Sequence, residues 1–236
     1  MFAGKSVIVF DMDGTLIDSV GVWNDVDRIV IKHIGNVDID PESCQAQRDI
    51  LLRQCSAAPN PYLEYCGFLQ RKYASSLTAE QIIQLRTDVA DELLTTAVMY
   101  KKDAENVLAA LKARGFTLVV ATTTSRANMG IYRTRNKNIM EKAPLDALFT
   151  RIYTREDVRN IKPDPEVYRR VLDDFCIPPE ECLVFEDSLV GVEAANSAGI
   201  DVVAMYDAYS DEQRAHINER ATYRFDTYAA VLALLA

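Results

Sequence analysis

Short, uniformly apolar segments alternate with helical patterns along most of this chain, and this alternation constrains its fold more than any other feature. The segments are rich in β-branched residues and lie at Ser6–Phe10, Thr117–Ala121, Leu183–Phe185 and Val202–Met205, with a weaker one at Tyr223–Phe225. Strands that are apolar on both sides must be covered on both faces, which is typical of parallel sheets in α/β proteins. The pattern therefore predicts an α/β fold with a doubly wound parallel sheet.

Helical patterns lie between several of these segments. Asp103–Gly115 has an acidic first turn, a basic last turn and a closing glycine. Pro163–Phe175 opens with prolines, which a helix tolerates in its first turn, and Val190–Gly199 is rich in small residues and also ends at a glycine. Each is expected to form a helix that covers one face of the sheet.

The stretch from about Val20 to Val98 differs from the rest of the chain. It has no strand pattern and contains helical patterns at about residues 22–34, 42–54, 61–74 and 79–98. The sequence "LTAEQ" has the form of a capped start for the last of them. We therefore predict a second, smaller α-helical domain over residues 18–96, inserted after the first strand of a core domain formed by residues 1–17 and 97–236.

The composition limits the partners of the chain. It has 236 residues, with 26 Lys and Arg against 35 Asp and Glu, which gives a formal net charge of −9. Such an acidic chain matches neither nucleic acid nor an anionic membrane, so we expect no partner of either kind.

Its five cysteines contain no CxxC pair and are expected to be reduced thiols. With no apolar run of signal-peptide or membrane length, the chain is expected to be cytoplasmic; its oligomeric state stays open.

Polar residues follow the apolar strands where those strands end. Asp11 and Asp13 come after the first strand, Thr122–Arg126 after the second, and Glu186 with Asp187 after the third. Ligands of open α/β sheets bind outside the carboxyl ends of the strands, and parallel strands bring those ends to one edge. The sequence therefore predicts a site at this edge.

Up to four carboxylates, those of Asp11, Asp13, Glu186 and Asp187, would gather there. Two unit charges about 4 Å apart repel by roughly 4 kcal/mol at an effective dielectric near 20, so the cluster needs a cation or protons. Because no His or Cys joins these hard oxygen ligands, the donor set favours Mg²⁺ over zinc or copper. We therefore expect Mg²⁺ as the cofactor.

The same residues suggest phosphoryl chemistry. Asp11, at the strand tip, could attack phosphorus and form an aspartyl-phosphate, and Asp13 could move the proton. Thr122, Thr123 and Lys162 are expected to bind phosphate oxygens, with Lys162 neutralising charge as well. The candidate catalytic residues are thus Asp11, Asp13, Thr122 and Lys162.

The segments "DMDGT", "VVATT", "KPDPEVY" and "FEDSLVGVEAA" occur in this order between Asp11 and Gly199, and as a set they resemble the four motifs of the haloacid dehalogenase superfamily. The helical stretch resembles the inserted cap of its phosphoglycolate phosphatase and β-phosphoglucomutase-like branch. The resemblance implies a Rossmann-like core, hydrolysis of phosphoric monoesters, and Mg²⁺ held by Asp11, the Asp13 carbonyl and Asp187. It implies that Glu186 binds the metal directly or through water.

Three functions fit these residues: a phosphatase acting on a small phosphorylated metabolite, a sugar-phosphate mutase, and a non-enzymatic phospho-acceptor switch. Dehalogenases and phosphonoacetaldehyde hydrolases of the family lack the second aspartate of the first motif. This chain has that aspartate, Asp13, so neither activity is expected. The similar mutase has a histidine where this chain has Trp23, which favours plain hydrolysis. Sugar phosphates, phosphoglycolate and nucleotides all stay open as substrates.

Two nearby segments have a structural interpretation. Asp18 and Ser19 are interpreted as shaping the linker into the helical domain or capping its first helix. The strongly basic segment from Arg126 to Lys142 is interpreted as an exposed helix, with steering of anionic substrates as the alternative.

Overall fold

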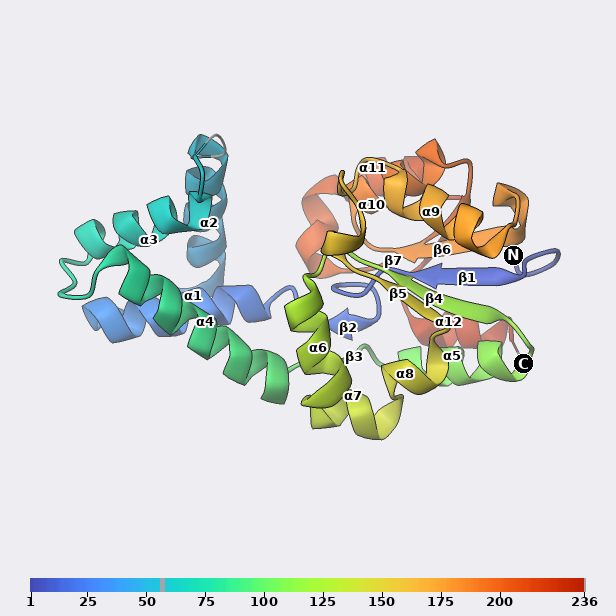
Figure 1. The fold of residues 1–236 in the computed structure, drawn as a ribbon, viewed down its shortest axis with the longest axis horizontal. Coiled ribbons are helices and arrows are strands. Elements are labelled where there is room, and N and C mark those ends of the chain that lie inside the picture. The colour runs from blue at the N-terminus through green and yellow to red at the C-terminus, as the bar shows by residue number, and fades with distance from the viewer. Residues whose placement is uncertain (56–57, 236) are drawn as a thin grey trace. The chain divides into compact units, whose positions relative to one another are not determined.

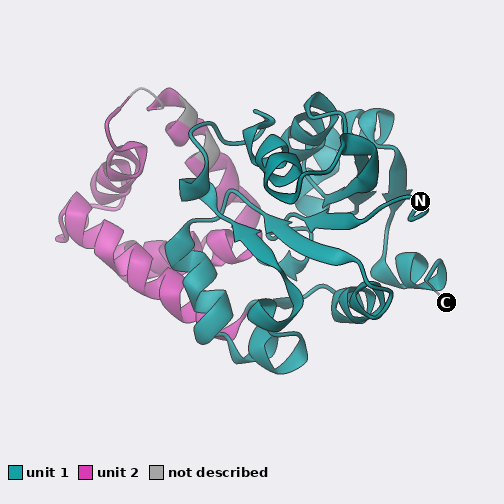
Figure 2. Cartoon of the chain, turned by 45° about the vertical axis from the view of Figure 1, so that its right-hand side comes forward, with its two compact units in different colours: residues 1–19, 98–236 teal, residues 20–97 magenta. Residues whose placement is uncertain are grey.

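The structure is a computed structural model that describes residues 1–55 and 58–235, except for the side chains of residues 49 and 53. Its chain divides into two compact units, shown in different colours in Figure 2. One comprises residues 1–19 and 98–236 and is called the α/β unit below. The other comprises residues 20–97 and is called the helical unit.

The α/β unit is built on a six-stranded parallel sheet with the order β5-β4-β1-β6-β7-β8. Its strands are β1 (Val7–Phe10), β4 (Thr117–Ala121), β5 (Arg151–Tyr153), β6 (Cys182–Glu186), β7 (Asp201–Met205) and β8 (Tyr223–Phe225). All five predicted strands are present, and the predicted doubly wound α/β fold is confirmed. The edge strand β5 was not predicted.

Helices cover both faces of this sheet (Figure 1). The helices of the unit are α5 (Ala104–Ala113), α6 (Arg126–Thr134), α7 (Lys137–Lys142), α8 (Leu145–Leu148), α9 (Glu166–Phe175), α10 (Leu189–Ser197), α11 (Arg214–Arg220) and α12 (Tyr228–Ala233). Helices α9, α10 and α11 lie on one face, and α5 and α12 lie on the other. This is the arrangement that strands apolar on both sides require.

The strand β1 shows why both faces must be covered. Val7 and Val9 belong to the cluster packed against α9 and α10, whereas Phe10 stacks on Phe185 from the other face, with ring centroids 4.7 Å apart. All four residues of β1 are at most 3% exposed. Alternate side chains of a strand point to opposite faces, so a strand buried on both has no polar position.

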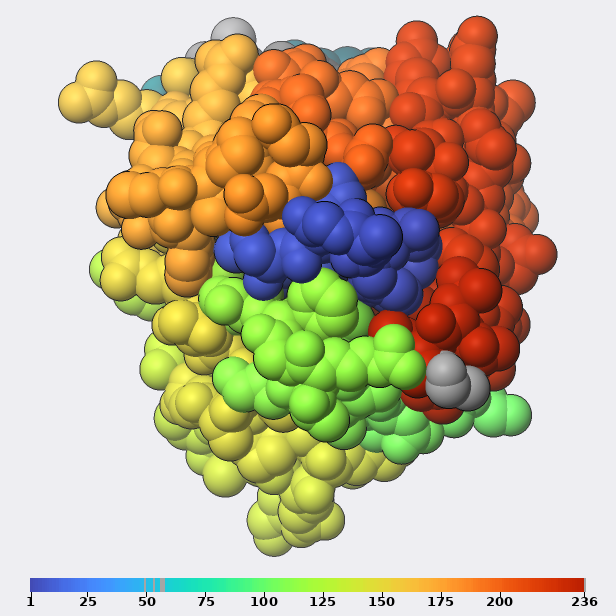
Figure 3. Space-filling view, turned by 90° about the vertical axis from the view of Figure 1, so that its right-hand side faces the viewer, coloured from blue at the N-terminus to red at the C-terminus, as the bar shows by residue number. Residues whose placement is uncertain are grey.

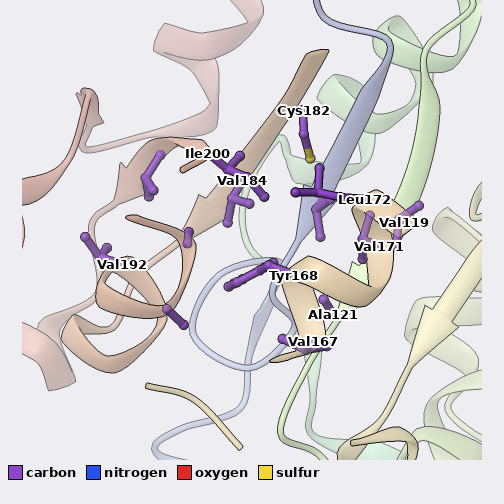
Figure 4. Packing of buried hydrophobic residues seen from close by; sticks show 14 of the residues in the cluster. Val119, Ala121, Val167, Tyr168, Val171, Leu172, Cys182, Val184, Val192 and Ile200 are labelled. Carbon is purple, nitrogen blue, oxygen red and sulfur yellow. The ribbon is translucent and has the colours of Figure 1, made fainter. Parts of the chain in front are cut away.

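Helix α9 packs through the apolar stripe that its sequence predicts. In Figure 4, Val171 lies beside Val119 of β4, and Val167 lies beside Ala121 at the end of the same strand. All of these side chains are buried in one cluster. Their packing fixes the helix, and with it the loop before it, against the sheet.

The two ends of the sheet differ in chemistry. Figure 3 looks onto the end where the strands begin, and there the N-terminal segment (blue) lies between the segments that precede β4 (green) and β6 (orange). Backbone hydrogen bonds from Ser6 N–H to Glu181 and from Thr117 N–H to Ser6 close this end. The motif residues all follow the opposite, carboxyl ends of the strands.

Among its described residues, the helical unit contains four helices, at the places where the sequence predicts them: α1 (Val22–Gly35), α2 (Pro41–Gln54), α3 (Pro61–Lys72) and α4 (Ala79–Thr96). Thr78 and Gln81 form the predicted capping box of α4. Asp27 is fully buried and accepts hydrogen bonds from Arg48 (2.7 Å) and Arg86 (2.8 Å), which link α1 to α2 and α4. The guanidinium of Arg86 also lies 5.4 Å from the ring centre of Trp23.

Two short strands of the α/β unit precede and follow the helical unit in sequence. They are β2 (Ile17–Asp18) and β3 (Met99–Tyr100), and they pair antiparallel. Two residues carry too little alternation to predict a strand, so neither β2 nor β3 was predicted. Their pairing brings the two points where the chain leaves and re-enters the α/β unit side by side.

All five cysteines are free thiols. Among the described residues, none of the helices combines the length and apolar character that crossing a membrane requires.

We expect Phe185→Ala to lower the free energy of unfolding by about 3–5 kcal/mol, because it opens a cavity in a packed core. Phe185 is fully buried and its ring lies against those of Phe10 and Tyr228. Urea denaturation followed by circular dichroism measures the change. Met140→Ala, at an exposed position in α7, is the control and should stay within about 0.5 kcal/mol of wild type. Equal losses in the two variants would contradict this account of the core.

Candidate active site

Asp11 owes its position to the register of the central strands. Phe10 pairs with Val120 of β4 on one side and with Phe185 of β6 on the other. The next residue, Asp11, therefore lies between the ends of two neighbouring strands, and its N–H donates to the Phe185 carbonyl (3.0 Å). Asp11 is only 7% exposed, so the carboxylate is held at the sheet edge with little access to water.

Lys162 connects the ends of three strands. Its Nζ donates to Asp11 Oδ1 (2.7 Å), the Ala121 carbonyl (2.8 Å) and Glu186 Oε1 (2.6 Å). Burial opposes the charge on this side chain, but the Asp11 and Glu186 carboxylates outweigh it and raise the pKa of Lys162. The ammonium therefore stays charged although Lys162 is only 6% exposed.

Glu186 is held on both of its carboxylate oxygens. Oε1 accepts from Lys162 and from the Tyr168 hydroxyl (3.0 Å). Oε2 accepts from the N–H groups of Asp187 (3.1 Å) and Ser188 (3.3 Å) and from Ser188 Oγ (3.0 Å). These donors leave Glu186 little freedom to turn toward another partner.

Asp187 completes the acidic group. Its Oδ1 accepts from Thr15 Oγ1 (2.6 Å), and Ser210 Oγ lies 3.4 Å from Oδ2. The chain can pass so close to this carboxylate only because residue 14 is a glycine. Gly14 has φ +82°, and a Cβ added to it would lie 2.5 Å from Asp187 Oδ2.

The carboxylates of Asp11, Glu186 and Asp187 form a compact buried group, with one oxygen of each within 4.8 Å of the others. Burial raises the pKa of Asp11 well above its usual range; Glu186 and Asp187 act in the same direction, and Lys162 opposes them. Burial and the Glu186 carboxylate raise the pKa of Asp187 to about 7. Among the described residues, Lys162 is the one side-chain cation that contacts this group. The negative charge that the three carboxylates can carry therefore exceeds the positive charge beside them.

This excess is a chemical fit for a divalent cation. Oxygen donors at this spacing suit a hard ion such as Mg²⁺. Both carboxylate oxygens of Glu186 already accept hydrogen bonds from protein groups. Asp11 and Asp187 are therefore the carboxylates better able to turn toward a metal.

Asp13 lies apart from the group formed by the other three acids. Its Oδ1 accepts from Ser19 Oγ (2.5 Å) and the Tyr132 hydroxyl (3.3 Å), and its Oδ2 accepts from Thr124 Oγ1. Burial and the Asp13 carboxylate raise the pKa of the Tyr132 phenol. Of the four acids expected to gather, the structure thus brings three carboxylates together and holds the fourth separately.

The two threonines expected to bind phosphate follow β4. Thr122 is buried, its N–H donates to the Tyr153 carbonyl, and its Oγ1 accepts from the N–H of Thr124 (3.1 Å). Thr123 is exposed. Both therefore lie at the same sheet edge as Asp11. Thr122 is held there by burial and hydrogen bonds, whereas Thr123 is exposed to solvent.

Sequence reasoning gave no role beside the acids to the hydroxyl groups that contact them, although Ser19 was interpreted as part of the linker into the helical domain. The hydroxyl groups are those of Thr15, Ser19, Thr124, Tyr132, Tyr168 and Ser188. Ser188 and Tyr168 could have been found from their places within "FEDS" and "KPDPEVY". Tyr132 carries no signal in the sequence, since it lies in the basic segment interpreted as an exposed helix.

The fold and the site together define an α/β enzyme whose carboxylates, lysine and threonines stand at the carboxyl edge of a parallel sheet. Comparison with known proteins agrees with this class. The family of haloacid dehalogenase-like hydrolases matches the chain over residues 8–205. The chain therefore belongs to the haloacid dehalogenase-like hydrolases, and the family inferred from its motifs is confirmed.

Individual relatives support the same placement. The phosphorylated carbohydrates phosphatase of Thermotoga maritima is 29% identical over 198 residues, which cover 82% of each chain. Protein CbbY of Rhodobacter capsulatus is 40% identical over 101 residues, which cover only 42% of each chain. The crystal structure of CbbY from Rhodobacter sphaeroides in complex with phosphate has a TM-score of 0.67 at 23% identity and covers 95% of both chains, a likeness of fold.

We expect Gly191→Ala to destabilise the protein by about 1–3 kcal/mol through overpacking. A Cβ at residue 191 would lie 1.9 Å from the Glu186 carboxylate and must displace it from Lys162. Gly130→Ala is the matched control, since Gly130 is also helical and a Cβ there meets nothing within 4 Å. That control should be neutral or stabilising by up to about 1 kcal/mol. Thermal denaturation compares the two, and equal behaviour would show that Glu186 tolerates displacement.

Proposed function

We propose that this protein is a Mg²⁺-dependent phosphatase that hydrolyses a small phosphorylated metabolite through an aspartyl-phosphate at Asp11. The family match and the phosphatase among its relatives make the chain a phosphoric monoester hydrolase. The observation that carries the proposed mechanism is the separation of the two motif aspartates. Asp11 is fixed beside a lysine within the buried acidic group, whereas Asp13 is held outside it by hydroxyl groups.

In the first step, a carboxylate oxygen of Asp11 attacks phosphorus, and the bond from phosphorus to the substrate's ester oxygen breaks. Asp13, in its protonated form, gives its proton to the departing oxygen. In the second step, Asp13 takes a proton from water, the water oxygen attacks phosphorus, and the bond to Asp11 breaks. Inorganic phosphate is released, Asp11 is again a free carboxylate, and Asp13 again carries a proton.

Lys162 has two roles in this scheme. Its contacts with Asp11 and Glu186 orient the nucleophile, and its charge is placed to offset negative charge that develops on the phosphoryl group. Thr122 and Thr123 would hydrogen-bond the transferred phosphoryl oxygens from the end of β4. Glu186 would keep Lys162 in place and reach the metal through water.

Asp11, Asp187 and the main-chain carbonyl of Asp13 would hold the Mg²⁺. When bound, the ion neutralises charge on the phosphoryl oxygens and on the carboxylates that surround them. The excess of buried carboxylates over cations supports this assignment.

The substrate is proposed to be a sugar phosphate or phosphoglycolate. The relative from Thermotoga maritima is named for phosphorylated carbohydrates, which supports the first of these. We further propose that residues 18–96 act as a cap domain that selects the substrate, and that the enzyme works in the cytoplasm.

We expect the wild-type protein with Mg²⁺ to release inorganic phosphate from one or more members of a panel of phosphorylated metabolites. Asp11→Asn should lower that release by at least about 10³-fold, because an amide is a poor nucleophile. A colorimetric phosphate assay measures release, and chromatography of the products detects isomerised sugar phosphate. Isomerisation without release would favour a mutase instead. A long-lived phosphoprotein with neither product would favour a phospho-acceptor switch.

We expect Mg²⁺ to raise the midpoint of thermal denaturation in the absence of any substrate. An ion that binds only the folded state at 100 times its dissociation constant stabilises it by about 2.7 kcal/mol. Asp187→Asn should reduce the shift, because it removes a charge from the acidic group. Sodium chloride at equal ionic strength is the control for screening. A shift that is the same in both proteins would remove Asp187 from the proposed metal site.

A further inference from the structure

The Asp13 carboxylate is surrounded by three hydroxyl groups from three separate parts of the α/β unit. Ser19 lies directly after β2, Thr124 lies in the loop after β4, and Tyr132 lies in α6. Ser19 and Tyr132 both donate to Oδ1, and Thr124 donates to Oδ2. Nothing in the motif pattern around Asp13 requires a tyrosine from a helix that is 119 residues further along the chain.

The position of Tyr132 is fixed by the way in which α6 begins. Ser125 caps the helix by accepting from the N–H of Asn128. From this start, Met129 and Tyr132, one helical turn apart, both lie on the buried face, and Tyr132 is only 1% exposed. The phenol ring is therefore held by packing, and its hydroxyl reaches the side of Asp13 that Ser19 also contacts.

Both oxygens of Asp13 accept hydrogen bonds in this arrangement. In the mechanism proposed above, this is the side chain that takes a proton from water in the second step. The three hydroxyl groups hold both of its oxygens and therefore fix the orientation of the Asp13 carboxylate.

We propose that Tyr132 is a positioning residue for Asp13, and that its hydroxyl orients the Asp13 carboxylate for hydrolysis of the aspartyl-phosphate. This inference rests on the proposed function and adds a residue to it. In the step concerned, a water O–H bond breaks, its proton goes to Asp13, and the water oxygen forms a bond to phosphorus as the bond to Asp11 breaks. Tyr132 makes and breaks no covalent bond.

The test compares two buried tyrosines whose hydroxyl groups each donate to a carboxylate. Tyr132→Phe removes the hydroxyl beside Asp13. Tyr153→Phe is the matched control, because Tyr153 is also 1% exposed and donates to a carboxylate, that of Asp174 at 2.7 Å. Asp174 belongs to α9 and lies outside the acidic group of the site. A purely structural effect of losing a buried phenol hydroxyl should appear in both variants.

The probe is p-nitrophenyl phosphate with Mg²⁺, followed by stopped-flow. Nitrophenolate leaves as a stable anion and needs little help from an acid, so its release reports the first step, whereas phosphate release reports the second. For Tyr132→Phe we expect kcat to fall by about ten-fold, as for loss of one hydrogen bond to a charged group, with KM not rising. Phospho-enzyme should accumulate, giving an initial burst of nitrophenolate close to one per site. Tyr153→Phe should keep the wild-type kcat and burst, and the two variants should have similar melting temperatures.

Several outcomes would overturn the inference. These are a wild-type kcat in Tyr132→Phe, a raised KM with unchanged kcat, or a fall in kcat without a larger burst. If Tyr132→Phe folds poorly, Ser19→Ala removes the other donor to Oδ1 and must give the same larger burst. If the wild-type protein itself releases neither nitrophenolate nor phosphate, the proposed function fails, and that result is distinct from a failure confined to Tyr132→Phe.

Discussion

One buried ammonium group holds the site together. Lys162 contacts two carboxylates and a main-chain carbonyl, and these acceptors come from the ends of β1, β4 and β6. A charge this deeply buried is stable only with partners, and removing one partner of such a pair costs about 3–5 kcal/mol. The loop before α9, the central strands and the acidic group therefore depend on one another. Packing of α9 against the sheet delivers the lysine to that position.

Separation of the two motif aspartates is the other main feature of the site. They are two residues apart in sequence, yet one is bound by a lysine and the other by hydroxyl groups. Gly14 lets the chain turn immediately after Asp13 and pass close to Asp187. The two identical side chains therefore have different hydrogen-bond partners: a buried ammonium group for Asp11 and neutral hydroxyl groups for Asp13. The proposed division into nucleophile and proton carrier follows from this difference.

Much of the fold could be predicted from the sequence, and the exceptions have identifiable causes. Apolar runs such as Thr117–Ala121 predict their own burial, and so does the apolar stripe of α9. The strand β5, "RIY", is short and begins with an exposed arginine; it is a strand because Val119 and Ala121 of β4 offer it a pairing edge. Helix boundaries near Gly115 and Gly199 were close to those observed, since glycine ends a helix by local backbone geometry.

For the site, the sequence alone determined which acids and threonines stand at the carboxyl edge of the sheet, because the end of a buried strand is a local property of the chain. It indicated Lys162 through the segment "KPDPEVY" and not through a strand end. Tertiary structure decided which of those groups contact one another. The contact of Lys162 with Asp11 spans 151 residues, and that of Tyr132 with Asp13 spans 119. Such contacts depend on where the helices pack against the sheet. No local pattern of residues predicts those positions.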